Sequence, residues 1–137
     1  LNYNEKKYDT VFIDAFKGLN APFELTTYEA MQRVYNSLNE NGTVITNIIA
    51  SLEGEDTDFI EYEYTTYKAV FDDVKLFKVN PDYPDDGKQN LILVGIRGNA
   101  DINTDKEEEY HELLSNEIKD FTSDKPIVTD DYAPIGD

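Results

Sequence analysis

The chain has 137 residues, which is one domain's worth of sequence and enough to bury a core. Its 12 basic and 29 acidic residues give a formal net charge of −17, which repels nucleic acid phosphates, so nucleic acid is not an expected partner. The absence of cysteine excludes disulfides, thiol catalysis and thiolate metal sites, and with a single histidine no metal site is expected.

The first predicted element is a buried strand over residues 8–16 (YDTVFIDAF). Its unbroken apolar run Val11, Phe12 and Ile13 favours a parallel strand that is covered on both faces. The strand would place Asp14 at its carboxyl end, where open α/β sheets bind their ligands. Asp14 is therefore a candidate catalytic base or amine anchor, although a carboxylate in this position can equally cap the next turn.

A helix and a second strand are predicted after an intervening loop. Thr26 and Glu29 form a capping-box pattern, which predicts that the helix begins there, and the Asn-Gly pair at residues 41–42 predicts its end. Residues 43–49 (TVITNII) are rich in β-branched side chains and predict a second buried strand, which completes a strand-helix-strand crossover. The helix positions expected to face inward are Tyr28, Met31, Tyr35 and Leu38.

The second half of the chain predicts two more helices and an antiparallel pair of strands. An acidic loop over residues 53–58 precedes a helix, and residues 74–79 and 90–96 are the expected strands, joined by a loop of turn-forming residues. A last helix is expected over residues 104–118, followed by an irregular tail. The inward positions of the first of these helices are Ile60, Tyr64, Tyr67 and Phe71.

Two further residues are candidates near the carboxyl edge of the predicted sheet. Asn47 lies near the end of the second strand, where an amide can orient an amine or a ribose, or can satisfy a backbone group. Tyr83 lies between Pro81 and Pro84, which would make its loop rigid and fix the direction of the ring. The alternative for Tyr83 is a ring packed over the edge of the sheet.

The tail offers a second group of candidates. Asp130, Asp131 and Tyr132 combine two acids with an aromatic ring, which is a plausible clamp for a cation; the alternative is a turn in which aspartate acts as a local cap. No glycine-rich phosphate loop of the GxGxxG or GxxxxGK type is present, so the residues that would bind a cofactor are unknown.

In this order, the segments resemble the C-terminal half of the spermidine synthase family, the polyamine aminopropyltransferases. The runs YDTVFIDAF and APFELTTYEAMQRVYNSLNENGTVITN resemble the family's central strand, substrate loop, helix and following strand. The run PDYPDDGKQNLILVG resembles its Pro-x-Tyr-Pro loop and final strand, and PIVTDDYAPIGD is similar to the tail of bacterial spermidine-synthase-like proteins. The resemblance implies an α/β fold: a partial Rossmann-like, methyltransferase-type three-layer sandwich of parallel strands plus a terminal antiparallel strand.

The resemblance also implies roles for the candidate residues. Asp14 matches the acid that deprotonates the attacking amine of putrescine, so that the amine displaces the aminopropyl group of decarboxylated S-adenosylmethionine. Tyr83 matches a tyrosine that helps hold the amine, and Asn47 falls where the family usually has glutamine. Lys17 stands where the family has a second acid. Another acceptor, an S-adenosylmethionine-dependent methyltransferase and a non-enzymatic acidic binding module therefore stay open.

We expect residues 1–137 to form a single domain that corresponds to the C-terminal half of such an enzyme, without its nucleotide-binding half. The fragment alone would then bind no cofactor and be inactive, and its first strand would have an unpaired apolar edge, which predicts a homodimer. No apolar run approaches the roughly 18 residues that span a bilayer, so a cytoplasmic location without direct membrane contact is expected. A membrane segment upstream in the intact protein stays open.

Overall fold

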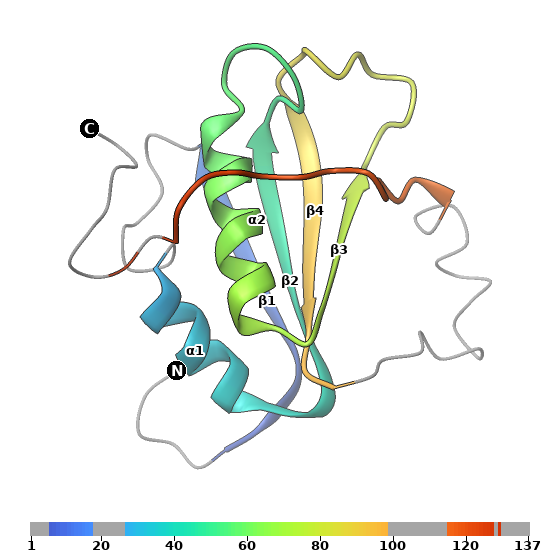
Figure 1. Cartoon of the computed structure of the whole chain (residues 1–137). Helices are drawn as coiled ribbons and strands as arrows, with labels where there is room; N and C mark the ends of the chain where they lie inside the picture. Colours follow the sequence, from blue (N-terminus) through green and yellow to red (C-terminus); the bar gives the residue numbers. More distant parts are fainter. Residues whose placement is uncertain (1–5, 18–26, 99–114, 128, 130–137) are drawn as a thin grey trace.

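The computed structural model describes residues 6–17, 27–98, 115–127 and 129. Within them four strands form one sheet of order β1-β2-β4-β3 (Figure 1). Strands β1 and β2 are parallel, and β4 runs antiparallel to both of its neighbours, which confirms the predicted α/β sheet with an antiparallel strand. The elements are β1 (Tyr8–Lys17), α1 (Tyr28–Ser37), β2 (Leu38–Ala50), α2 (Asp58–Val70), β3 (Asp73–Lys78) and β4 (Gln89–Ile96).

Helices α1 and α2 cover the same face of the sheet (Figure 1). Alternate residues of β2 are buried beneath them, because successive side chains of a strand point to opposite faces. The described residues thus form a sheet and one helical layer of the expected sandwich. The largest fully buried side chains of this core are Tyr67, Met31, Leu38, Ile48, Ile60, Leu76, Leu91, Leu93, Ile96, Val34 and Val44.

Helix α1 begins one residue later than expected and ends earlier. Its N-cap is Thr27, whose Oγ1 accepts a hydrogen bond of 3.1 Å from the backbone N–H of Ala30. The prediction that the helix continues to residues 41–42 is wrong, because Leu38 is already extended, fully buried and paired with Tyr8 of β1. Asn41 does adopt the left-handed conformation, with φ of 65°, but it does so within β2.

Helix α2 buries the expected face and two polar residues besides. Ile60 and Tyr67 are buried as predicted, and Phe71, which follows the helix, is buried in an extended conformation. Glu63 and Thr66 are buried as well, which the apolar pattern did not predict. The two last strands lie within one residue of the predicted ranges.

Residues 115–127 run first along β3 and then across α2 (Figure 1). The backbone N–H of Ile118 donates to the Leu76 carbonyl at 2.7 Å, so Ile118 pairs with the sheet instead of lying on the expected helix. Further on, Lys125 forms an ion pair of 3.2 Å with Asp58 at the start of α2. The described residues from 121 onward form no helix or strand, as predicted, and most of the expected helix over residues 104–118 lies outside the described residues.

Candidate functional site

Strand β1, which carries Asp14, lies at an edge of the sheet and pairs with only β2 among the described strands. Val11 and Ile13 pack against the core, whereas Phe12 is 75% exposed. The expectation that β1 is covered on both faces is therefore wrong for the described part of the chain. A short apolar run places hydrophobic side chains on both faces of a strand, but it does not show whether other elements cover both faces.

Asp14 and Asn47 are neighbours across the β1–β2 pair. They are partners in the parallel register, which places their backbones about 4.8 Å apart. Both alternate with residues that face the helices, so their side chains lie on the opposite face of the sheet, with Asp14 exposed and Asn47 half-buried. The register becomes irregular directly after Asp14, and such irregularities often re-aim a side chain next to a site. The register thus places the backbones of the two candidate residues side by side, and the convergence of the carboxylate and the amide on one site stays a prediction.

Tyr83 lies at the same end of the sheet. Strands β2 and β3 are both antiparallel to β4, so they run in the same direction. The loop after β3 therefore lies at the same end of the sheet as the carboxyl ends of β1 and β2 (Figure 1). Tyr83 is 40% exposed, and its ring packs on Gly87 of its own loop. Strands β1 and β4 are two strand spacings apart, about 10 Å, so a substrate would have to bridge from Asp14 to this loop.

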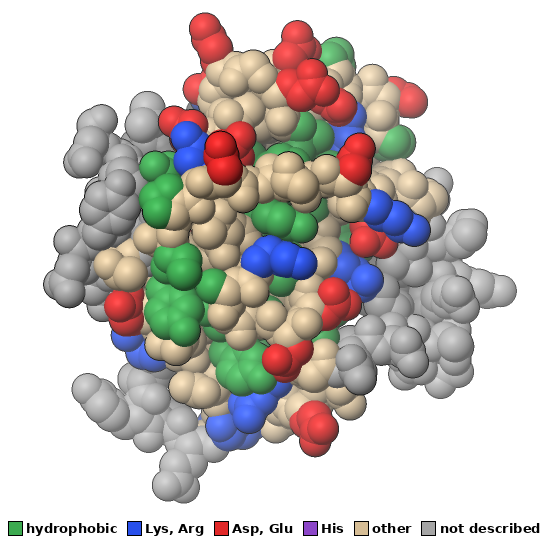
Figure 2. Space-filling model, viewed as in Figure 1, with side chains coloured by type: hydrophobic (Ala, Val, Ile, Leu, Met, Phe, Trp, Pro, Cys, Tyr) green, Lys and Arg blue, Asp and Glu red, His purple; other side chains and the backbone are tan. Residues whose placement is uncertain are grey.

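The loop after β2 and the loop before β4 are joined at this edge. The backbone N–H groups of Leu52 and Glu53 both donate to the carbonyl of Asp85, at 2.8 and 3.0 Å. The two loops are acidic, and Figure 2 shows Asp and Glu side chains gathered at the end of the molecule that they form. Such a concentration of like charge attracts cations, including protonated amines. The exposed acids concerned are Glu53, Glu55, Asp56, Asp82, Asp85 and Asp86.

The remaining candidates are placed less fully. Asp130, Asp131 and Tyr132 lie outside the described residues, and Lys17 is the last residue of β1, whose side chain is also outside them. In the described part of the chain no three His, Asp or Glu side chains group as metal ligands would. Neither described helix has the length and apolar character needed to cross a membrane.

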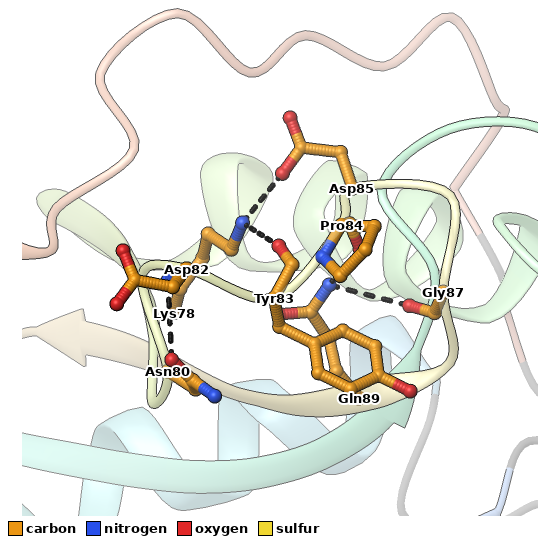
Figure 3. A network of polar contacts seen from close by, with 8 residues as sticks. All are labelled: Lys78, Asn80, Asp82, Tyr83, Pro84, Asp85, Gly87 and Gln89. Atoms are coloured by element: carbon orange, nitrogen blue, oxygen red, sulfur yellow. Dashed lines mark hydrogen bonds and ion pairs between the residues drawn. The ribbon is translucent and has the colours of Figure 1, made fainter.

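Sequence reasoning missed Lys78 and Gln89, which flank the loop that carries Tyr83 (Figure 3). Lys78 ends β3 and Gln89 begins β4, and both bond to the backbone of the loop between them. The signal in the sequence was a lysine and a glutamine placed on either side of a stretch dense in turn formers. Long polar side chains in such positions can extend into solvent as easily as they can bond to the loop, so the sequence pattern alone does not reveal these hydrogen bonds.

Comparison with known proteins places this geometry in context. No family model matches the chain. Over 88 residues it is 27% identical to a polyamine aminopropyltransferase from Vibrio vulnificus, a match that covers 64% of this chain and 26% of the relative. The crystal structure of a probable spermidine synthase from Corynebacterium glutamicum matches with a TM-score of 0.61 at 18% identity, covering 97% of this chain and 52% of the other.

The chain thus spans about a quarter of the curated relative and about half of the solved one. The structural match extends over nearly all of the chain and includes the mixed sheet with β1 and β2 parallel. The sequence match is weaker, and it points in the same direction. The chain is therefore similar in sequence to a polyamine aminopropyltransferase, and it shares the partial Rossmann-like fold of a probable spermidine synthase.

Proposed function

We propose that this chain supplies the amine-acceptor side of an active site that transfers an aminopropyl group from decarboxylated S-adenosylmethionine to a small amine such as putrescine. The observation that carries the proposal is the pairing of Asp14 with Asn47 at the carboxyl edge of a spermidine-synthase-like sheet. The acidic loops at the same edge would favour a cationic substrate.

In the proposed reaction Asp14 takes a proton from the ammonium group of the acceptor, which frees the nitrogen lone pair. The nitrogen then attacks the aminopropyl carbon of the sulfonium donor: the new nitrogen–carbon bond forms as the carbon–sulfur bond breaks, and a neutral thioether leaves. Asn47 would orient the amine through its amide, and Tyr83 would hold the far part of the acceptor. Holding the nitrogen, carbon and sulfur in line supplies much of the rate.

The donor would be bound by residues outside this chain, since the chain spans about half of the solved relative. We therefore propose that the isolated chain, as a single domain, is inactive and binds no donor on its own. We propose that the intact enzyme acts on polyamines in the cytoplasm and that it forms a homodimer.

The test is Asp14→Asn in a full-length protein that contains this chain. Removing the base should lower kcat for aminopropyl transfer by about 100-fold or more, the usual contribution of a general base. Asp9→Asn is the matched control, because Asp9 is exposed on the same strand and its contact with the Asn39 amide needs only an oxygen acceptor. Near-normal transfer by the Asp14 variant would exclude it as the base.

One feature favours a second function within the same fold. Lys17 stands where the resemblance leads us to expect a second acid, and its positive charge would repel a diamine. The alternative is methyl transfer from S-adenosylmethionine to a different acceptor. Calorimetry on the full-length protein with each donor in turn separates the two, since tighter binding of the decarboxylated form supports aminopropyl transfer and tighter binding of S-adenosylmethionine supports methyl transfer.

A further inference from the structure

The loop that carries Tyr83, residues 79–88, is held from β3 by one half-buried lysine, Lys78 (Figure 3). Lys78 donates from Nζ to the backbone oxygen of Tyr83 and to Oδ1 of Asp85, both at 2.6 Å. Its side chain is 12% exposed, so most of the lysine packs against the protein while the ammonium group bonds to these two acceptors. Removing the cation would leave two loop acceptors without their partner, which favours a looser loop.

The same loop is held from β4 by an amide. Gln89 is buried and donates from Nε2 to the carbonyl oxygens of Pro84 and Gly87, at 2.9 and 3.2 Å. Within the loop, the backbone N–H of Tyr83 donates to the Asn80 carbonyl at 3.2 Å, which closes a turn around Pro81. Side chains from both flanking strands therefore fix the backbone on either side of the tyrosine.

Gly87 fixes the ring itself. A Cβ atom added at this position would lie 3.2 Å from Cδ1 and 3.3 Å from Cζ of Tyr83, and closer still to Cε1. The ring packs directly on the backbone of Gly87, and any side chain there would push the ring away. The moving part would be the end of the tyrosine side chain, so the fold of the loop need not change.

We propose that Lys78 and Gly87, assisted by Gln89, are positioning residues that hold the Tyr83 ring in one place as a preformed wall of the amine site. The inference rests on the proposed function, in which Tyr83 contacts the acceptor. Because the loop is ordered on folding, little conformational entropy is lost when the amine binds. The rigidity that the sequence attributes to two prolines comes as much from one lysine and one glycine.

The first measurement is ¹⁹F NMR of the chain labelled with 3-fluorotyrosine, which gives one signal for each of its 10 tyrosines; Tyr83→Phe assigns the signal of interest. Lys78→Met should broaden or shift the Tyr83 signal, and Gly87→Ala should shift it with little loss of stability. Lys75→Met is the matched control. Lys75 lies on the same strand and forms an ion pair with Asp73 at 3.6 Å, so the Tyr83 signal should stay unchanged.

The second measurement is the KM for each substrate of the full-length protein. Both test variants should raise the KM for putrescine by about tenfold, equivalent to about 1.4 kcal/mol, while the KM for the sulfonium donor stays the same. A purely structural defect would change both. An unchanged Tyr83 signal overturns the positioning role, and a changed signal with an unchanged putrescine KM overturns its link to the amine. These outcomes can be told apart from a failure of the proposed function, which would show instead as full activity of the Asp14→Asn variant.

Discussion

Glu63 on α2 places a carboxyl group inside the core. The residue is 2% exposed, and neither its Oε1 atom nor the nearby Thr66 Oγ1 has a hydrogen-bond partner in the described part of the chain. Burial raises the pKa of Glu63 well above its usual range, because the charged form would lose its water. The pKa of Tyr67 is raised mainly by burial and, to a smaller extent, by repulsion from a negative charge on Glu63. The Tyr67 hydroxyl is hydrogen-bonded to Thr46.

This residue predicts how stability depends on pH. An unfolded glutamate titrates near pH 4.3, and the folded pKa is higher, so the folded state binds a proton that the unfolded state releases. Stability from this group is fully present below the unfolded pKa and is lost as pH rises through the folded pKa. Glu63→Gln should therefore reduce the loss of stability between pH 5 and pH 8.

Urea unfolding of both proteins at pH 5 and pH 8 measures this difference. Glu55→Gln is the control, since Glu55 is exposed on a loop and its substitution should leave the pH dependence as it is. An identical pH dependence for the wild type and Glu63→Gln would mean that Glu63 is ionised in the folded state, with a partner that satisfies it.

At the scale of elements, the C-terminal end of α2 packs closely on β4, where Phe71, the residue after the helix, lies against Gly95. Gly95 lies on the helix-covered face of β4, and a Cβ atom there would come within 2.6 Å of Cγ in the ring of Phe71. That ring is buried and also packs on Tyr67, with centroids 5.0 Å apart, so it has little room to move. The end of α2 can approach the sheet this closely because β4 has no side chain at that point.

Gly95→Ala should consequently destabilise the protein by about 1–3 kcal/mol, as overpacking does, although alanine normally stabilises a strand relative to glycine. Thermal or urea unfolding measures the effect. The double variant with Phe71→Leu should lose less stability than the sum of the two single variants, because the smaller side chain relieves the overlap. A Gly95→Ala protein as stable as the wild type would show that the ring has another place to go.

The elements themselves were largely predictable, and their limits and surroundings less so. The periodicity of apolar residues and the runs of β-branched residues predicted all four strands and both described helices, since both are local properties of the sequence. The switch from α1 to β2 at Leu38 was not predictable, because it depends on pairing with Tyr8, 30 residues earlier in the chain. The neighbourhood of Asp14 and Asn47 followed from parallel strands, whereas Lys78 and Gln89 meet only once the loop has folded.

At the scale of the molecule, the face of the sheet opposite the helices carries an apolar row that ends at β1, the edge strand of the described sheet. Phe12 of β1 is paired with Ile45 of β2, which is paired with Val94 of β4, and the last two are only half-buried. An edge strand with a large exposed apolar side chain is a template for pairing with another chain. The net charge of −17 opposes such association between identical chains.

These two properties predict a dimer through β1 that tightens with salt, because salt screens the repulsion between the chains and leaves the apolar contact intact. At tens of micromolar, sedimentation should show more dimer in 0.5 M than in 0.05 M NaCl. Phe12→Lys should abolish the dimer, although the added positive charge lowers the repulsion. Ile127→Lys, which also puts lysine in place of an exposed apolar side chain but lies outside β1 and is 39% exposed, should retain it. If both variants dimerise alike, contact is made elsewhere; if the wild type is monomeric at both salt concentrations, the edge of β1 does not associate with itself.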